Sequence, residues 1–162
     1  MKLGLDIHGV INVNASFFSA FSKLALEREH EVHIITGSML TPRKIEEIKR
    51  YGVVWTNIFS ISDYHRHLGT TMTFSDPNNP WIDHTLWDKT KAVYCEDFNI
   101  DFHIDDTLRY GEYFKTPFAL YDHENKRLDW HLGGQKHGAL PLTNPEEILN
   151  IIEKISSDIK RA

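Results

Sequence analysis

The segment with the clearest chemical potential begins at Asp6, directly after the apolar residues 3–5. The apolar run predicts a short buried strand, with Asp6 at its carboxyl end and Gly9 in the turn that follows. Open parallel sheets place their ligand sites at the carboxyl ends of strands. His8 stands between these two residues, and imidazole has an ordinary pKa of about 6.5, which suits proton transfer near neutral pH. The pattern favours a reactive carboxylate at this position.

Polar residues also follow other apolar runs. Thr36 and Gly37 come after residues 32–35, and the pair Asp105 and Asp106 comes after residues 100–104. Adjacent carboxylates at the end of an apolar strand repel each other unless a cation is near. Lys91 lies on the predicted helix that leads into this strand. In a doubly wound sheet, all of these residues converge on one edge.

Apolar strand patterns alternate with helical patterns about four times, which predicts an α/β fold. We expect a doubly wound, Rossmann-like parallel sheet of about five strands with helices on both faces. The expected strands are residues 3–6, 32–36, a strand led by 53–55, 100–105 and 118–121. The expected helices are residues 15–29, a helix from Pro42, residues 85–98 and a helix from Pro145. We expect residues 76–80 to form a turn-rich loop and residues 122–142 a surface loop.

Composition narrows the class of protein. A chain of 162 residues fits a single domain spanning 1–162. The net charge of −5 makes a nucleic-acid partner unlikely. Cys95 is the only cysteine, which excludes an intramolecular disulfide and a cysteine-based zinc site. No apolar run approaches membrane-spanning length and the start does not resemble a signal peptide, so we expect a cytoplasmic protein without a membrane partner. A homo-oligomer is one of the alternatives for the quaternary structure.

Four segments in order resemble the four motifs of the haloacid dehalogenase-like (HAD) hydrolases. Residues 3–11 are similar to the first motif, an apolar strand followed by Asp-x-Asp-Gly, and residues 33–38 to the second, a strand ending in Thr or Ser. Lys91 matches the third motif, and residues 102–106 match the fourth. The resemblance covers most of the chain. It implies a Mg²⁺-dependent hydrolase, favours a phosphoric monoester hydrolase, and makes a small-molecule phosphate ester the expected substrate.

The resemblance also implies residue roles. Asp6 would attack phosphorus and form an aspartyl phosphate, which divides one difficult displacement into two easier ones. Asp6, Asp105 and the backbone carbonyl of His8 would supply hard oxygen ligands for Mg²⁺. Asp106 would be either a further ligand or a partner of the ligands. Lys91 would offset negative charge on the phosphoryl group.

Three further residues are expected to hold phosphate oxygens. These are Thr36, through its hydroxyl, and Gly37 and Gly9, through their backbone N–H groups.

His8 is a departure from the HAD pattern, because phosphatases of this family carry a second Asp there as the acid–base group. In one interpretation, His8 performs the same proton transfers. In a second, the protein is a HAD-like hydrolase of a non-phosphoester bond. In a third, it is a catalytically weak protein that binds an anion or nucleotide.

No large cap domain fits between Asp6 and Thr36, but residues 60–89 are long enough for a small flap over the site. Trp81 and Trp87 lie in this flap. Stacking on a base or sugar is one role for them, although packing is the commoner role of such residues. The flap also contains His65 and His67. A solvated helix end is a simpler expectation for these two histidines than a zinc site.

Overall fold

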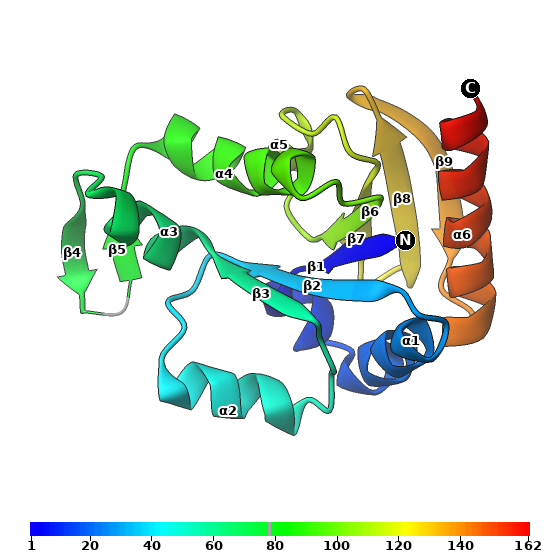
Figure 1. Ribbon diagram of the computed structural model, residues 1–162, viewed down its shortest axis with the longest axis horizontal. Helices are drawn as coiled ribbons and strands as arrows, with labels where there is room; N and C mark the ends of the chain where they lie inside the picture. The colour runs from blue at the N-terminus through cyan, green and yellow to red at the C-terminus, as the bar shows by residue number, and fades with distance from the viewer. Residues whose placement is uncertain (78) are drawn as a thin grey trace.

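The computed structural model describes residues 1–77 and 79–162 and shows an α/β protein (Figure 1). Its main sheet has seven strands in the order β3-β2-β1-β6-β7-β8-β9. The first five strands in this order run parallel, and β8 and β9 continue the sheet in antiparallel fashion. The strands are β1 Lys2–Leu5, β2 Glu31–Thr36, β3 Asn57–Ser60, β6 Phe102–Asp105, β7 Phe118–Asp122, β8 Arg127–Leu132 and β9 Gln135–Pro141.

Helices connect the parallel strands. They are α1 Ala15–Glu27, α2 Pro42–Arg50, α3 Ile61–Leu68, α4 His84–Asp97 and α5 Leu108–Gly111. A further helix, α6 Pro145–Arg161, follows the last strand. Residues Ile7–Ile11 (η1) form a turn after β1, with non-helical backbone at His8 and Gly9. The expected starts at Pro42 and Pro145 are confirmed. Each of these helices is capped by the side chain of the preceding residue, Thr41 or Asn144, which accepts a hydrogen bond from a backbone N–H of the first turn.

Helices cover both faces of the sheet. Successive residues of a buried strand point to opposite faces, so neighbouring residues of β2 pack against different helices. Ile34 of β2 packs into a cluster that includes Phe18 of α1 and Ile152 of α6. Its neighbour Ile35 packs into a second cluster with Cys95 of α4. Figure 1 shows α4 and α5 on one side of the sheet and α1 and α2 on the other. The expected α/β class is confirmed.

The predicted strand count was too low, because residues 122–142 are not a surface loop. They contain the hairpin β8–β9, which extends the sheet beyond its parallel part. Gly133 and Gly134 both have positive φ, 59° and 77°, and form the tight turn between the two strands. β8 does alternate, with Leu128, Trp130 and Leu132 between polar residues, but β9 is largely exposed and shows no such alternation.

The third strand was placed too early in the chain. Val53 is buried, but it lies in a loop, and β3 begins only at Asn57. Thr56 marks the transition. Its hydroxyl accepts from the backbone N–H of Val32 at 3.0 Å, and its own N–H donates to the Val32 carbonyl at 2.8 Å. Regular pairing of β3 with β2 therefore starts one residue later.

Residues 60–89 contain α3, the beginning of α4 and a separate two-stranded antiparallel sheet. The two strands are β4 Thr73–Asp76 and β5 Asn79–Trp81. Figure 1 shows this hairpin extending beyond the end of the main sheet. The expected loop at residues 76–80 therefore lies within a hairpin, and its central residue Asn78 lies outside the described residues. None of the helices in the described part of the chain is long and apolar enough to cross a membrane.

Candidate active site

Three carboxylates meet where β1 and β6 end. The two strands are parallel neighbours with Leu5 paired to Ile104, so the residues that follow them lie side by side. The backbone N–H of Asp6 continues the ladder with a hydrogen bond to the Ile104 carbonyl at 3.0 Å. Carboxylate oxygens of Asp6, Asp105 and Asp106 all lie within 4.8 Å of one another. Residues that are 99 positions apart in the chain thus form one acidic cluster.

Gly9 allows this cluster to be compact. Its φ of +77° is a left-handed conformation that glycine adopts without strain, and its N–H donates to Asn12 Oδ1 at 2.7 Å. A Cβ atom on Gly9 would overlap the carboxylate of Asp106. The turn after β1 therefore leaves the space that Asp106 occupies.

Lys91 reaches the acidic cluster from α4. Its Nζ lies 2.7 Å from Asp105 Oδ2 and 3.0 Å from Asp6 Oδ1, and the lysine is only 2% exposed. Burial alone would lower the pKa of Lys91, but the carboxylates of Asp105 and Asp6 raise it well above its usual value. The lysine is therefore a fixed positive charge shared by two acids.

Asp105 uses its full capacity as a hydrogen-bond acceptor. Oδ2 faces Lys91 and the Nε2 atom of His103 at 3.0 Å. Oδ1 accepts the backbone N–H groups of Asp106 at 2.9 Å and Thr107 at 3.3 Å. Burial opposes ionisation of this carboxyl, but Lys91 and His103 outweigh it and hold its pKa well below the usual range. Asp105 is thus a buried, ionised anchor.

Asp6 and Asp106 are less well compensated. Burial raises the pKa of Asp6 to about 8 against the opposing effect of Lys91, and the nearby charges of Asp105 and Asp106 add to the increase. The pKa of Asp106 is also raised, by burial and by Asp105. One lysine faces three carboxylates, so the cluster has an excess of negative charge. Hard oxygen donors with such an excess are typical of a divalent-cation site.

His103 contacts the acidic cluster, but it was not among the predicted site residues. Its imidazole is fully buried, lies parallel to the Phe114 ring at 5.2 Å, and contacts Asp105. Burial lowers its pKa despite this carboxylate. Gly4 on the neighbouring strand provides the space, since a Cβ there would be 2.5 Å from His103 Nδ1. A sequence signal did exist: residues two apart on a strand, such as His103 and Asp105, share a face.

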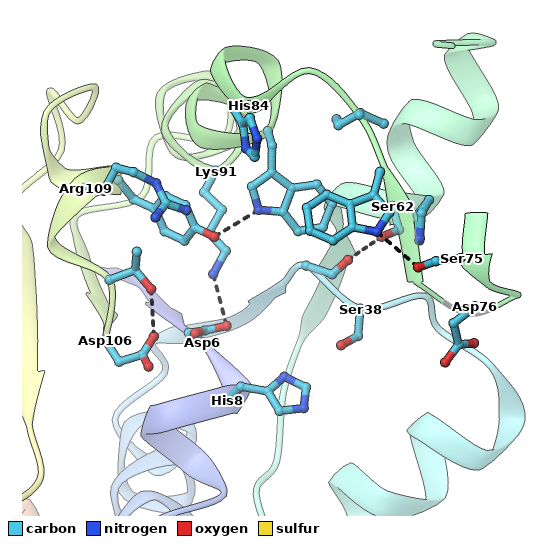
Figure 2. Close-up of a pocket in the computed structure, with 17 residues that line it drawn as sticks. Asp6, His8, Ser38, Ser62, Ser75, Asp76, His84, Lys91, Asp106 and Arg109 are labelled. Carbon is cyan, nitrogen blue, oxygen red and sulfur yellow. Dashed lines mark hydrogen bonds and ion pairs between the residues drawn. The ribbon is translucent and has the colours of Figure 1, made fainter. Parts of the chain in front are cut away.

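The acidic cluster lies at the base of a cleft of about 690 Å³. Five of the predicted site residues line it: Asp6, His8, Gly37, Lys91 and Asp106. Figure 2 shows Lys91 directed at Asp6, with His8 on the side of Asp6 away from Lys91. His8 is exposed in the cleft, and desolvation by the cleft walls together with the charge of Lys44 of α2 lowers its pKa. The structure therefore places an imidazole and a carboxylate in one cleft.

The remaining predicted residues lie behind this surface. Thr36 is fully buried at the end of β2, and its hydroxyl accepts the N–H of Ser38 at 3.2 Å. Thr36, Gly9 and Asp105 are not among the residues that line the cleft. Thr36 shapes the loop that presents Gly37, as Gly9 shapes the turn beside Asp106.

The flap forms the opposite wall of the cleft. Trp81 of β5 and Trp87 of α4 both line it, and Trp87 lies against Gly37. Arg109 also lines the cleft, but its Nε donates to Asp88 at 2.9 Å. The arginine therefore pairs with an acid of α4 rather than with the acidic cluster.

His65 was expected at a solvated helix end and is instead buried. Its ring nitrogens lie 2.9 Å from the Thr70 hydroxyl and 2.7 Å from the Thr90 hydroxyl. Within residues 1–77 and 79–162, neither His65 nor His67 belongs to a group of metal-binding side chains. His65 joins α3 to α4 and so fixes the base of the flap.

No protein-family model matches this chain, and no curated protein matches it.

Proposed function

We propose that the protein is a Mg²⁺-dependent phosphatase of the HAD-like type that acts through an aspartyl phosphate on Asp6. The observation that supports this most strongly is the acidic cluster with its single buried lysine, placed at the carboxyl edge of a parallel sheet and open to a cleft. An ion pair with a purely structural role would not need to open onto a cleft, and a surface acidic patch would not need a buried lysine. The Rossmann-like strand order around β1 agrees with the proposal.

The donor set fits Mg²⁺. Asp105 already accepts four hydrogen bonds, so Asp6 and Asp106 are the carboxylates with free oxygen capacity, and the carbonyl of His8 is the third proposed ligand. Bound Mg²⁺ would offset the charge of the phosphoryl group. Asp105 acts by holding Lys91 in place and by accepting the backbone N–H groups of Asp106 and Thr107, which orients the backbone at Asp106.

The first chemical step uses Asp6 as nucleophile. A carboxylate oxygen of Asp6 attacks phosphorus, the bond from phosphorus to the ester oxygen breaks, and the leaving oxygen takes a proton from His8. Lys91 remains protonated throughout and lowers the repulsion between the carboxylate and the phosphate. Gly37 presents a backbone N–H to the phosphate oxygens, because it lines the cleft beside Asp6.

The second step releases phosphate. Neutral His8 removes a proton from water, the water oxygen attacks phosphorus, and the bond to the Asp6 oxygen breaks. Inorganic phosphate leaves, and His8 regains the proton it used in the first step.

The test is Mg²⁺-dependent release of phosphate from a generic aryl phosphate. We expect wild-type turnover that is lost in EDTA and lost in Asp6→Asn. Asp158→Asn is the matched control, because it removes an exposed carboxylate of α6 far from the cleft, and it should retain full activity. Equal turnover by Asp6→Asn and wild type would exclude the proposed nucleophile.

Replacement of His8 separates the remaining interpretations. If His8 carries the proton, His8→Ala should lose most activity and His8→Asp should retain part of it. If the wild type is inactive on every phosphate ester and only His8→Asp gains activity, the native reaction is hydrolysis of another bond or ligand binding alone.

A further inference from the structure

The flap presents a tryptophan to the cleft that the core does not need. Trp81 is 57% exposed, whereas Trp55 and Trp130 are partly buried and pack against the main core. The indole is nevertheless held in place, because its Nε1 donates to Ser75 on the partner strand at 3.2 Å. The His84 ring approaches it edge-on, with centroids 6.3 Å apart. An exposed but fixed aromatic ring is suited to contact with a ligand.

A second indole stands closer to the acidic cluster. Trp87 lies against Gly37, where a Cβ would be 2.6 Å from the ring, and its Nε1 donates to the Tyr110 hydroxyl at 2.9 Å. Tyr110 in turn lies over Lys91, with Nζ 5.1 Å from the ring centroid. Both indoles line the cleft, and Figure 2 shows Ser75, which accepts the Trp81 N–H, on the opposite side of the cleft from Asp106. The cleft thus has an acidic end and an aromatic wall.

The size of the cleft agrees with a ligand that reaches both ends. Its volume of about 690 Å³ lies within the usual range for small-molecule and cofactor sites and far exceeds the needs of a phosphate group alone. Planar bases stack on aromatic side chains, and this contact tolerates different bases because every base has a π-face.

We propose, building on the phosphatase function above, that the substrate is a nucleoside monophosphate whose phosphate lies at Asp6 and whose base stacks on Trp81. The ribose spans the cleft along Trp87. The hydroxyl of Ser75 and the ring of His84 flank the base, since both side chains line the cleft. Specificity for the phosphate then resides on the sheet, and specificity for the base resides on the flap.

The experiment compares adenosine 5′-monophosphate with ribose 5-phosphate, which has the same ester and sugar but no base. Dissociation constants are measured by calorimetry with Mg²⁺ after Asp6→Asn is added to each protein to prevent turnover, and kcat/KM is measured in parallel with Asp6 intact. We expect wild type to prefer the nucleotide by about tenfold in both quantities. Trp81→Leu, which keeps apolar volume but removes the aromatic face, should reduce this ratio to near one, and Trp81→Phe should keep most of it.

Phe74→Leu is the matched control. Phe74 is 51% exposed on the same hairpin but does not line the cleft, so its loss should leave the ratio unchanged. Equal use of both compounds by wild type, or an equal effect of Phe74→Leu and Trp81→Leu, would overturn the base subsite while leaving the phosphatase intact. Nucleotide-selective binding that Trp81→Leu removes, without hydrolysis of any ester, would support the subsite and exclude the phosphatase.

Discussion

The ammonium group of Lys91 lies 3.0 Å from the Asp6 carboxylate, and both side chains are almost fully excluded from water. Lys91 is also bound to Asp105 at 2.7 Å, so its single charge is divided between two acids. Burial raises the pKa of Asp6, and a lysine that is shared with Asp105 does not offset this effect. A second cation in the cleft would complete the compensation, which is the physical basis for proposing Mg²⁺.

Replacement of Lys91 by methionine should destabilise the protein in EDTA. The methionine fills similar space but leaves buried carboxylates without their cation, a change that typically costs about 3–5 kcal/mol. Urea unfolding measures the loss. Lys89→Met on the same helix removes an exposed lysine and should cost less than about 1 kcal/mol. Similar losses in the two variants would show that Lys91 has no special electrostatic role.

Gly9→Ala should be more harmful than Gly69→Ala. Both glycines have φ above +70°, so both substitutions carry a similar backbone strain of about 1 kcal/mol. A methyl group at Gly69 meets nothing, whereas at Gly9 it overlaps Asp106. We expect only Gly9→Ala to weaken Mg²⁺ binding, as measured by calorimetry. Unchanged Mg²⁺ affinity in Gly9→Ala would contradict the placement of Asp106 at the metal.

Asp105→Asn and Asp106→Asn should fail in different ways. Asp106→Asn removes a proposed ligand from an exposed position, so Mg²⁺ affinity should fall by about 100-fold with a stability change below about 1 kcal/mol. Asp105→Asn breaks a buried pair with Lys91, so stability in EDTA should fall by about 3–5 kcal/mol. Calorimetry and urea unfolding separate the two effects. If Asp105→Asn instead loses Mg²⁺ affinity and Asp106→Asn instead loses stability, Asp105 is the direct ligand.

The sequence was sufficient to predict the α/β class and the position of Asp6 after β1, because both depend on local apolar runs and turn residues. The hairpin β8–β9 was not predicted: β8 alternates apolar and polar residues, but the exposed strand β9 does not. The pair Gly133 and Gly134 was a usable turn signal that the prediction did not exploit.

Contacts across the fold were harder to predict than positions along the chain. Thr36 appeared to be a phosphate ligand, yet its hydroxyl is buried and bound to Ser38. Arg109 follows the acidic pair in sequence but pairs with Asp88, because the short helix α5 places it beside α4. The partners of Thr36 and Arg109 depend on side-chain direction and on helix packing. The hydrophobic periodicity of the sequence does not reveal either.

His65 should make stability dependent on pH. Because burial lowers its pKa, the unfolded chain takes up a proton at a higher pH than the folded chain does. The free energy of unfolding should therefore fall as pH decreases below about 6.5, the ordinary pKa of histidine. His65→Gln should be less stable at pH 8 and have a shallower slope between pH 8 and 5. Parallel profiles for His65→Gln and wild type would show that His65 does not contribute.

The proposed function requires that Asp6 forms a phosphoryl bond beside a metal held by Asp6 and Asp106. A crystal structure grown with Mg²⁺ and fluoroberyllate, which mimics a phosphoryl group on a carboxylate, tests it without knowledge of the substrate. We expect beryllium bonded to a carboxylate oxygen of Asp6, with Mg²⁺ bound by Asp6 and Asp106. Fluoroberyllate on a different residue, or a structure with Mg²⁺ away from these two carboxylates, would contradict it.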